Sequence, residues 1–293
     1  MLASLASADT VTWVSIIVKV IAYAGTLIAV GSVLVLVALR EVDARGRTSL
    51  RRITVLAACV GAVFTVLRLP VRASFLMGGT WDGAMDPTIL GMVAQSPLGP
   101  SAALRLVGLA LILFVFWRAR SGQVIAIVGA VLASASFALR GHALGEPQVI
   151  LGALVTLHIL CLAFWIGGLA PLAQAARSEP PIRAGALAHE FGGRALWSVG
   201  LLVLAGGITL ALFGAASPAA LSTPYGQMFA AKIALFVGVL SLAAINKLSL
   251  TPALLADMPQ AGVRLRRSIT LEAVLITAIL CVTATLTTIS SPK

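Results

Sequence analysis

The chain has 293 residues, of which 59% are hydrophobic and 11% are charged, with 21 Lys and Arg against 10 Asp and Glu. Its mean hydropathy is +1.04 and long apolar runs recur along it, so the composition excludes a soluble globular domain and indicates a polytopic membrane protein. The net charge of +11 does not indicate a nucleic-acid partner, because the basic residues lie in short segments between apolar runs.

The apolar runs predict an all-α protein with eight transmembrane helices in a single integral membrane domain, residues 1–293. The N-terminal segment lacks the basic region of a cleaved signal peptide, so the first span is expected to act as an uncleaved targeting signal. The predicted spans run over about Val11–Leu39, Ile53–Met77, Leu98–Trp117, Val124–Arg140, Val149–Gln174, Leu196–Phe213, Met228–Lys247 and Ser268–Ile289.

Lysine and arginine are concentrated in alternate connections between these spans. The basic connections are Arg40–Arg52, Trp117–Gln123, Gln174–Arg194 and Lys247–Arg267, whereas Gly78–Pro97, Gly141–Gln148 and Ala215–Gln227 contain no Lys or Arg. By the positive-inside rule the basic connections face the cytoplasm. The sequence therefore predicts that both termini lie outside, on the periplasmic or extracellular side.

Two similar motifs precede apolar spans in the two halves of the chain. Ser96-Pro-Leu-Gly99 is followed by Arg105, and Thr223-Pro-Tyr-Gly226 is followed at the same spacing by Lys232. Because four spans per half give both halves the same orientation, the pattern predicts a parallel duplication of four plus four helices, with halves at 11–145 and 146–293.

The fifth predicted span contains a histidine. His158 lies ~14 Å along the helix from Val149, on its outer half. An imidazole at membrane depth is costly, which makes it a candidate functional residue, and a hydrogen bond between helices is the alternative. Cys161 follows three residues later on the same helix face and is either a second ligand or a small packing residue.

Further side chains that can bind a metal ion lie at or near the predicted outer side. Thiolate and thioether groups suit soft metal ions, and imidazole suits several transition metals. Each methionine is alternatively a flexible hydrophobic residue, and the histidine is alternatively a solvated loop residue. These candidate metal ligands are His142, Met77, Met85, Met92 and Met228.

Several charged residues lie within or at the edges of the predicted spans. Glu272 is a buried acid near the cytoplasmic end of the eighth span. A cation-lined route does not suit a cation permease, so anchoring at the lipid interface, pairing with acids or carbonyls, and binding of an anionic group remain the alternatives for the cations. The cations are Lys19, Arg68, Arg72, Arg105, Arg140 and Lys232.

Several short motifs follow one another in a specific order: Gly141-His-Ala143, His158 with Phe164-Trp-Ile-Gly-Gly168, Thr223-Pro-Tyr-Gly226 with Lys232, Ala244-Ile-Asn-Lys247 with Pro252, and Arg266-Arg-Ser268 with Leu271-Glu-Ala273. In these motifs the chain resembles the copper resistance protein D family. The resemblance implies eight membrane helices, copper as the transported ion, a location in the bacterial inner membrane, and a separate periplasmic chaperone of the copper resistance protein C type.

Three functions are compatible with these features. The first is a copper permease that receives the ion outside and passes it inward; no Walker A motif is present, and no enzymatic activity is expected. The second is an electron carrier with haem ligated by histidines. The third is a membrane partner of the chaperone that does not itself transport. The oxidation state of the copper and the oligomeric state stay open.

Overall fold

A computed structural model describes residues 9–117, 119–212 and 223–289, and the regular structure of these residues is helical. A π-helical turn, Asn246–Leu250, joins α10 to α11, and 3-10 turns occupy Leu113–Phe116 and Gly141–Leu144. The α-helices are α2 (Thr10–Ala38), α3 (Ala44–Leu76), α4 (Trp81–Met85), α5 (Pro87–Gln95), α6 (Leu98–Ile112), α7 (Arg120–Ala135), α8 (Gln148–Ser178), α9 (Pro181–Leu212), α10 (Pro224–Ile245), α11 (Thr251–Leu255) and α12 (Ala261–Ile289).

Seven helical segments among the described residues are long and apolar enough to cross a membrane. The predicted fourth span, Val124–Arg140, is a helix, but α7 ends at Ala135. Its 16 residues give a length of ~24 Å, less than the ~30 Å of a hydrocarbon core. That α7 crosses the membrane, which would give eight spans in total, therefore stays a prediction. The multi-pass, all-helical architecture is confirmed.

Three helices begin at least seven residues earlier than predicted, and all three begin in basic segments. The observed starts are Ala44, Pro181 and Ala261, whereas the predicted starts were Ile53, Leu196 and Ser268. Hydropathy marks only the part of a helix that lies in lipid, and arginine is a good helix former in water. The helices therefore continue beyond the apolar run.

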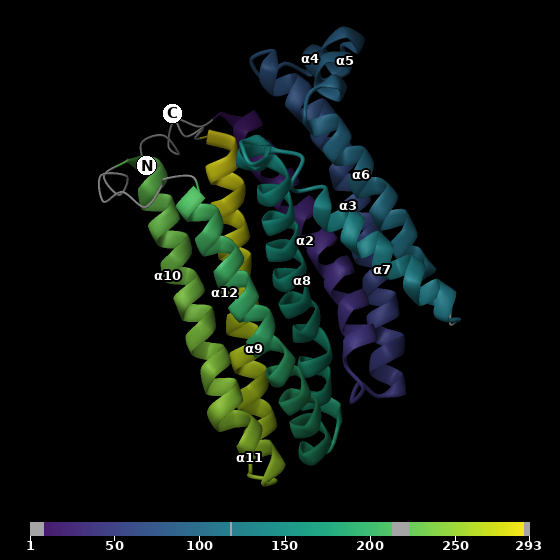
Figure 1. Ribbon diagram of the computed structural model, residues 1–293, viewed down its shortest axis with the longest axis vertical. Helices are drawn as coiled ribbons and strands as arrows, with labels where there is room; N and C mark the ends of the chain where they lie inside the picture. Colours follow the sequence, from purple (N-terminus) through teal and green to yellow (C-terminus); the bar gives the residue numbers. More distant parts are fainter. Residues whose placement is uncertain (1–8, 118, 213–222, 290–293) are drawn as a thin grey trace.

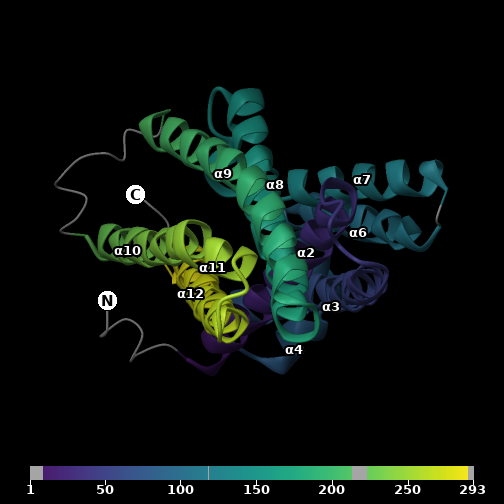
Figure 2. The same cartoon turned by 90° about the horizontal axis from the view of Figure 1, so that it is seen from below.

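Helix α2 lies at the centre of the molecule, in contact with α3, α8, α7 and α12 (Figures 1 and 2). Helices α3, α6 and α7 lie on one side of it, and α9, α10 and α12 on the other. We call the end of the bundle that carries α4, α5 and the turn Gly141–Leu144 the low-charge end. The opposite end, which carries α11 and the connection between α2 and α3, is the basic end.

Glycines bring the central helices into backbone contact. A Cβ added at Gly31 of α2 would lie 1.8 Å from the carbonyl oxygen of Ala163 of α8, and one added at Gly167 would lie 2.2 Å from the carbonyl carbon of Gly31. Such close approach is typical of membrane helices, where small residues let dispersion forces act between backbones. Gly168 also serves packing, since it lies against the ring of Phe191.

Both repeated motifs stand where helices begin. Thr223 is the N-cap of α10 and accepts a hydrogen bond from the backbone nitrogen of Gly226 at 3.0 Å. Ser96 ends α5, and its hydroxyl accepts from the backbone nitrogen of Leu98 at the start of α6. In the first half α2 pairs with α3 and α6 with α7, and in the second half α8 pairs with α9 and α10 with α12. The same order of helix pairs in both halves is consistent with the parallel duplication, which stays a prediction.

Candidate functional site

The four candidate methionines lie toward the low-charge end but in two separate places. Met77 caps α3, Met85 ends α4 and Met92 lies on α5, and these side chains are 46%, 77% and 61% exposed. Met228 lies on α10 and is 8% exposed. Helix α10 and the α4–α5 segment are apart in both views (Figures 1 and 2). The methionines therefore do not form one cluster.

His142 lies in the 3-10 turn Gly141–Leu144, directly before α8. Its side chain lies outside the described part of the structure. This turn is part of the low-charge end as defined above; the position of His142 on the outer side and its role as a ligand stay predictions.

His158 lies on α8, ten residues or ~15 Å from the start of the helix at Gln148. Its Nδ1 lies 3.3 Å from the carbonyl oxygen of Leu202 on α9. A carbonyl only accepts hydrogen bonds, so this contact assigns the proton to Nδ1 and leaves the lone pair of Nε2 free to bind a metal. Metal-binding histidines in proteins are held in this way, by a hydrogen bond from the other ring nitrogen.

Cys161 is buried on the same side of α8, and its backbone carbonyl accepts a hydrogen bond from the hydroxyl of Ser198 at 3.1 Å. The described residues contain no group of three or more His, Cys, Asp and Glu side chains that could hold a metal ion.

Haem ligation finds no support in this arrangement. The chain has three histidines, and His189 lies exposed near the basic end of α9. His142 stands at the low-charge end, whereas His158 lies three turns inside the bundle. Among the described side chains, none supplies a second imidazole at the depth of His158.

A buried carboxylate lies where α8, α10 and α12 meet. Glu272 of α12 is 2% exposed, and its Oε2 accepts a hydrogen bond from Trp165 Nε1 at 3.1 Å. Its Oε1 accepts from the Nδ2 of Asn246, the first residue of the π-helical turn. The Oδ1 of Asn246 is buried and has no hydrogen-bond partner in the described part of the chain. We call Glu272, Trp165 and Asn246 the carboxylate site.

The carboxylate site combines acceptor oxygens that suit a cation. A carboxylate inside a membrane segment is expensive and in transporters commonly marks an ion pathway. The unpartnered amide oxygen beside it adds a second acceptor, and π-helical turns occur frequently at functional sites. On α8, Trp165 follows His158 by seven residues, so both side chains lie on one side of the helix, ~10 Å apart along its axis.

In the sequence, Trp165 and Asn246 occur in two separate motifs and Glu272 is a buried acid in a third, and the linear chain does not bring the three together. All three residues belong to the short motifs that carry the family resemblance. This common feature is the sequence signal that could have grouped them into one site. Glu272 lies ~16 Å along α12 from the start of that helix at Ala261.

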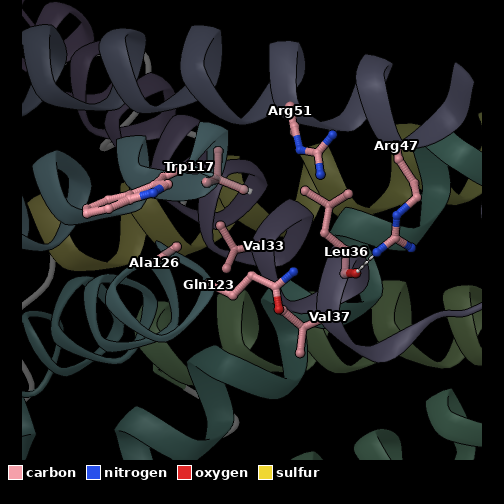
Figure 3. Close-up of a pocket in the computed structure, with 9 residues that line it drawn as sticks. Val33, Leu36, Val37, Arg47, Arg51, Trp117, Gln123 and Ala126 are labelled. Atoms are coloured by element: carbon pink, nitrogen blue, oxygen red, sulfur yellow. Dashed lines mark hydrogen bonds between the residues drawn. The ribbon is translucent and has the colours of Figure 1, made fainter. Parts of the chain in front are cut away.

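Cavities at the basic end do not include the candidate ligands. One of about 20 Å³ lies between α2, α3 and α7, and it is lined by Arg47, Arg51, Trp117 and Gln123, among others (Figure 3). This volume holds about one water molecule. In Figure 3 the Arg47 guanidinium turns to Leu36, whose carbonyl it binds at 2.9 Å, so this arginine stabilises the end of α2. A larger cavity of about 260 Å³ lies between Glu41 and Glu179.

Two family models match the chain. The model described as Copper resistance protein D-like, N-terminal domain matches residues 8–153, and the model described as Copper resistance protein D matches residues 185–286. Asn246 and Glu272 fall inside the second match, whereas His158 and Trp165 lie between the two. No curated protein and no solved structure matches the chain.

Proposed function

Because the chain belongs to the copper resistance protein D family, we propose that it carries copper ions across the membrane, from the low-charge end to the basic end. The arginine-rich connections orient the basic end toward the cytoplasm by the positive-inside rule, so this direction is uptake across the bacterial inner membrane. A membrane potential of 100 mV, negative inside, favours such movement by ~2.3 kcal/mol per charge.

The proposed route has an entry site and two positions inside the bundle. His142 and the exposed thioethers of Met85 and Met92 receive the ion at the low-charge end, where a separate chaperone of the copper resistance protein C type can deliver it. His158 then binds it through Nε2, and Glu272 attracts it further inward. Met77, Met228 and Cys161 stand near these steps as additional soft ligands.

The observation that carries the proposal is the hydrogen bond between His158 and the Leu202 carbonyl. It gives an imidazole at membrane depth the tautomer in which Nε2 keeps its lone pair for a metal. The same hydrogen bond also joins α8 to α9, so uptake by the His158→Ala variant decides between a metal ligand and a purely interhelical role.

Copper uptake into proteoliposomes tests the proposal. We expect uptake by the wild-type protein, and a decrease of at least tenfold for His158→Ala, because a lost ligand removes the intramembrane site. His142→Ala should decrease uptake mainly at low copper concentration, since it acts at entry. His189→Ala is the matched control, because this histidine is exposed at the basic end.

Two outcomes would contradict the proposal. If His158→Ala and His142→Ala transport normally, the ligand assignment is wrong. If the wild-type protein moves no copper in liposomes while cells that lack it lose copper accumulation, it acts as a partner of the chaperone and not as a permease.

Lys232 is expected to weaken copper binding at His158. Its ammonium lies close enough to the imidazole to repel positive charge there. We expect Lys232→Gln to raise the affinity of the purified protein for Cu(I) by about tenfold, as measured by competition with a chromogenic chelator. Lys247→Gln, at the opposite end of α10, is the control, and equal affinities for wild type and Lys232→Gln would refute the idea.

A further inference from the structure

Five cationic side chains converge in the half of the bundle nearer the low-charge end. They come from α2, α3, α6 and the turn that follows α7, and they are close enough to repel one another. Arg68, for example, lies eight residues before the end of α3, ~12 Å inside the helix end. We call this set the cation cluster; its members are Lys19, Arg68, Arg72, Arg105 and Arg140.

Arg105 is the most deeply buried member, with 1% of its side chain exposed. Its Nε donates to the hydroxyl of Ser136 at 3.0 Å, and its guanidinium carbon lies 4.0 Å from the ring centroid of Phe137. Its Nη1 is buried and has no hydrogen-bond partner among the described residues. A buried donor without an acceptor is costly, and more so when it carries charge.

Tyr23 lies between two of the arginines. The guanidinium carbons of Arg68 and Arg105 lie 5.3 and 5.5 Å from the centroid of its ring. Cation–π contacts of this kind attract each guanidinium to the ring, but they supply no net negative charge. The ring therefore holds two like charges close together without neutralising them.

No carboxylate neutralises the cluster. All ten Asp and Glu side chains of the chain are among the described residues, and their ion pairs with arginine join Glu179 to Arg183 and Glu190 to Arg194, at the basic end. Glu272 is engaged at the carboxylate site. Several buried cations without a counter-charge are unfavourable in a low-dielectric interior.

The cluster members differ in how well their donors are satisfied. Lys19 donates to the Thr287 carbonyl at 3.0 Å, and to the hydroxyls of Thr287 and Thr288 at 3.2 and 2.6 Å. Its ammonium therefore needs no further acceptor. Arg105 does need one, and Arg68 and Arg140 are its charged neighbours.

We infer that the cation cluster binds a phosphate group, held chiefly by Arg105, Arg68 and Arg140. A guanidinium presents parallel donors that match the oxygens of a phosphate, and one such group supplies both the missing acceptor and the missing negative charge. Arg72 lies one turn from Arg68 toward the low-charge end and is exposed, so it can guide an anion inward. The phosphate comes either from a lipid headgroup or from solution.

The cation cluster lies on α2, α3, α6 and the turn after α7, whereas His158 and Glu272 lie on α8 and α12. The phosphate site itself does not depend on which metal is carried, or on whether the protein transports at all.

The test is thermal unfolding of the full-length protein in an uncharged detergent. We add short-chain phosphatidylglycerol, short-chain phosphatidylcholine or inorganic phosphate. A ligand at a hundredfold excess over its Kd is expected to raise the Tm by about 5 °C. A shift with phosphatidylglycerol alone identifies an anionic lipid headgroup, a shift with both phospholipids identifies a lipid phosphate in general, and a shift with inorganic phosphate identifies a free anion.

Variants locate the effect. Arg105→Gln and Arg68→Gln should each lose most of the shift, whereas Arg52→Gln, an exposed arginine at the basic end with the same change of charge, should retain it. If Arg105→Gln does not fold, Arg68→Gln still decides the question. Native mass spectrometry of the wild-type protein should show one retained phosphate-bearing ligand without any substitution.

Two results would overturn the inference. One is a wild-type protein whose Tm responds to none of the three additives and which retains no phosphate-bearing ligand. The other is a shift that Arg68→Gln preserves in full, whatever Arg52→Gln does, since the anion then binds outside the cation cluster.

Discussion

We expect Glu272→Ala to lower the free energy of unfolding by about 3 kcal/mol and to abolish copper uptake. The substitution removes the acceptor of Trp165 Nε1 and of Asn246 Nδ2, and leaves both donors buried. It also removes the carboxylate to which the proposed route leads from His158. Thermal unfolding in detergent and uptake into proteoliposomes measure the two effects separately.

Glu272→Gln distinguishes structure from charge at the same position. Glutamine keeps the shape and one acceptor oxygen, so the protein should unfold within about 1.5 kcal/mol of wild type. Uptake should still decrease at least tenfold, because the negative charge that attracts the cation is gone. Glu41→Gln, an exposed acid at the basic end, is the control. Normal uptake by Glu272→Gln would show that the acid serves packing alone.

We expect Gly31→Ala to destabilise the protein by about 3 kcal/mol, because α2 and α8 can no longer meet. The added methyl group would lie 1.8 Å from the Ala163 carbonyl oxygen, and a backbone atom cannot turn aside as a flexible side chain can. The two helices would have to separate and would lose dispersion contacts along their length. Helix α8 carries His158, so uptake should decrease as well.

The matched control is Gly200→Ala on α9, where an added Cβ meets nothing within 4 Å. This substitution should be neutral or should stabilise the protein by about 0.5 kcal/mol, because alanine favours the helix. Thermal unfolding compares the two variants. Equal stability of Gly31→Ala and Gly200→Ala would mean that α2 and α8 tolerate separation, and that the contact between their backbones is not essential.

Hydropathy located the long helices because each needs about 20 apolar residues to cross the membrane. It failed where a helix leaves lipid, as at Pro181, and where a short helix lies at the surface. Helices α4 and α5 fall within Gly78–Pro97, which was predicted only as a connection. Their starts are capped by the side chains of Thr80 and Asp86, and such local hydrogen bonds leave no apolar periodicity in the sequence.

The candidate site was also predictable only in part. The sequence identified His158, because a single imidazole within an apolar run is unusual and costly in a membrane. It did not identify the carboxylate site, since Trp165, Asn246 and Glu272 lie on three different helices and each has an ordinary structural role by itself. The methionines were expected at or near the outer side, and only the structure shows that Met228 lies apart from the other three, because α10 and the α4–α5 segment are on different sides of the bundle.

By itself, the sequence determined that the chain is a multi-pass helical membrane protein of the copper resistance protein D family, because length, hydropathy and motif order are properties of the linear chain. Only the tertiary structure decided which polar residues meet inside the bundle. It brought Glu272 to Trp165 and Asn246, placed His158 Nδ1 beside the Leu202 carbonyl, and brought the guanidinium groups of Arg68 and Arg105 to the ring of Tyr23. These relations depend on how the helices pack and turn about their axes, and contacts between distant segments set that rotation.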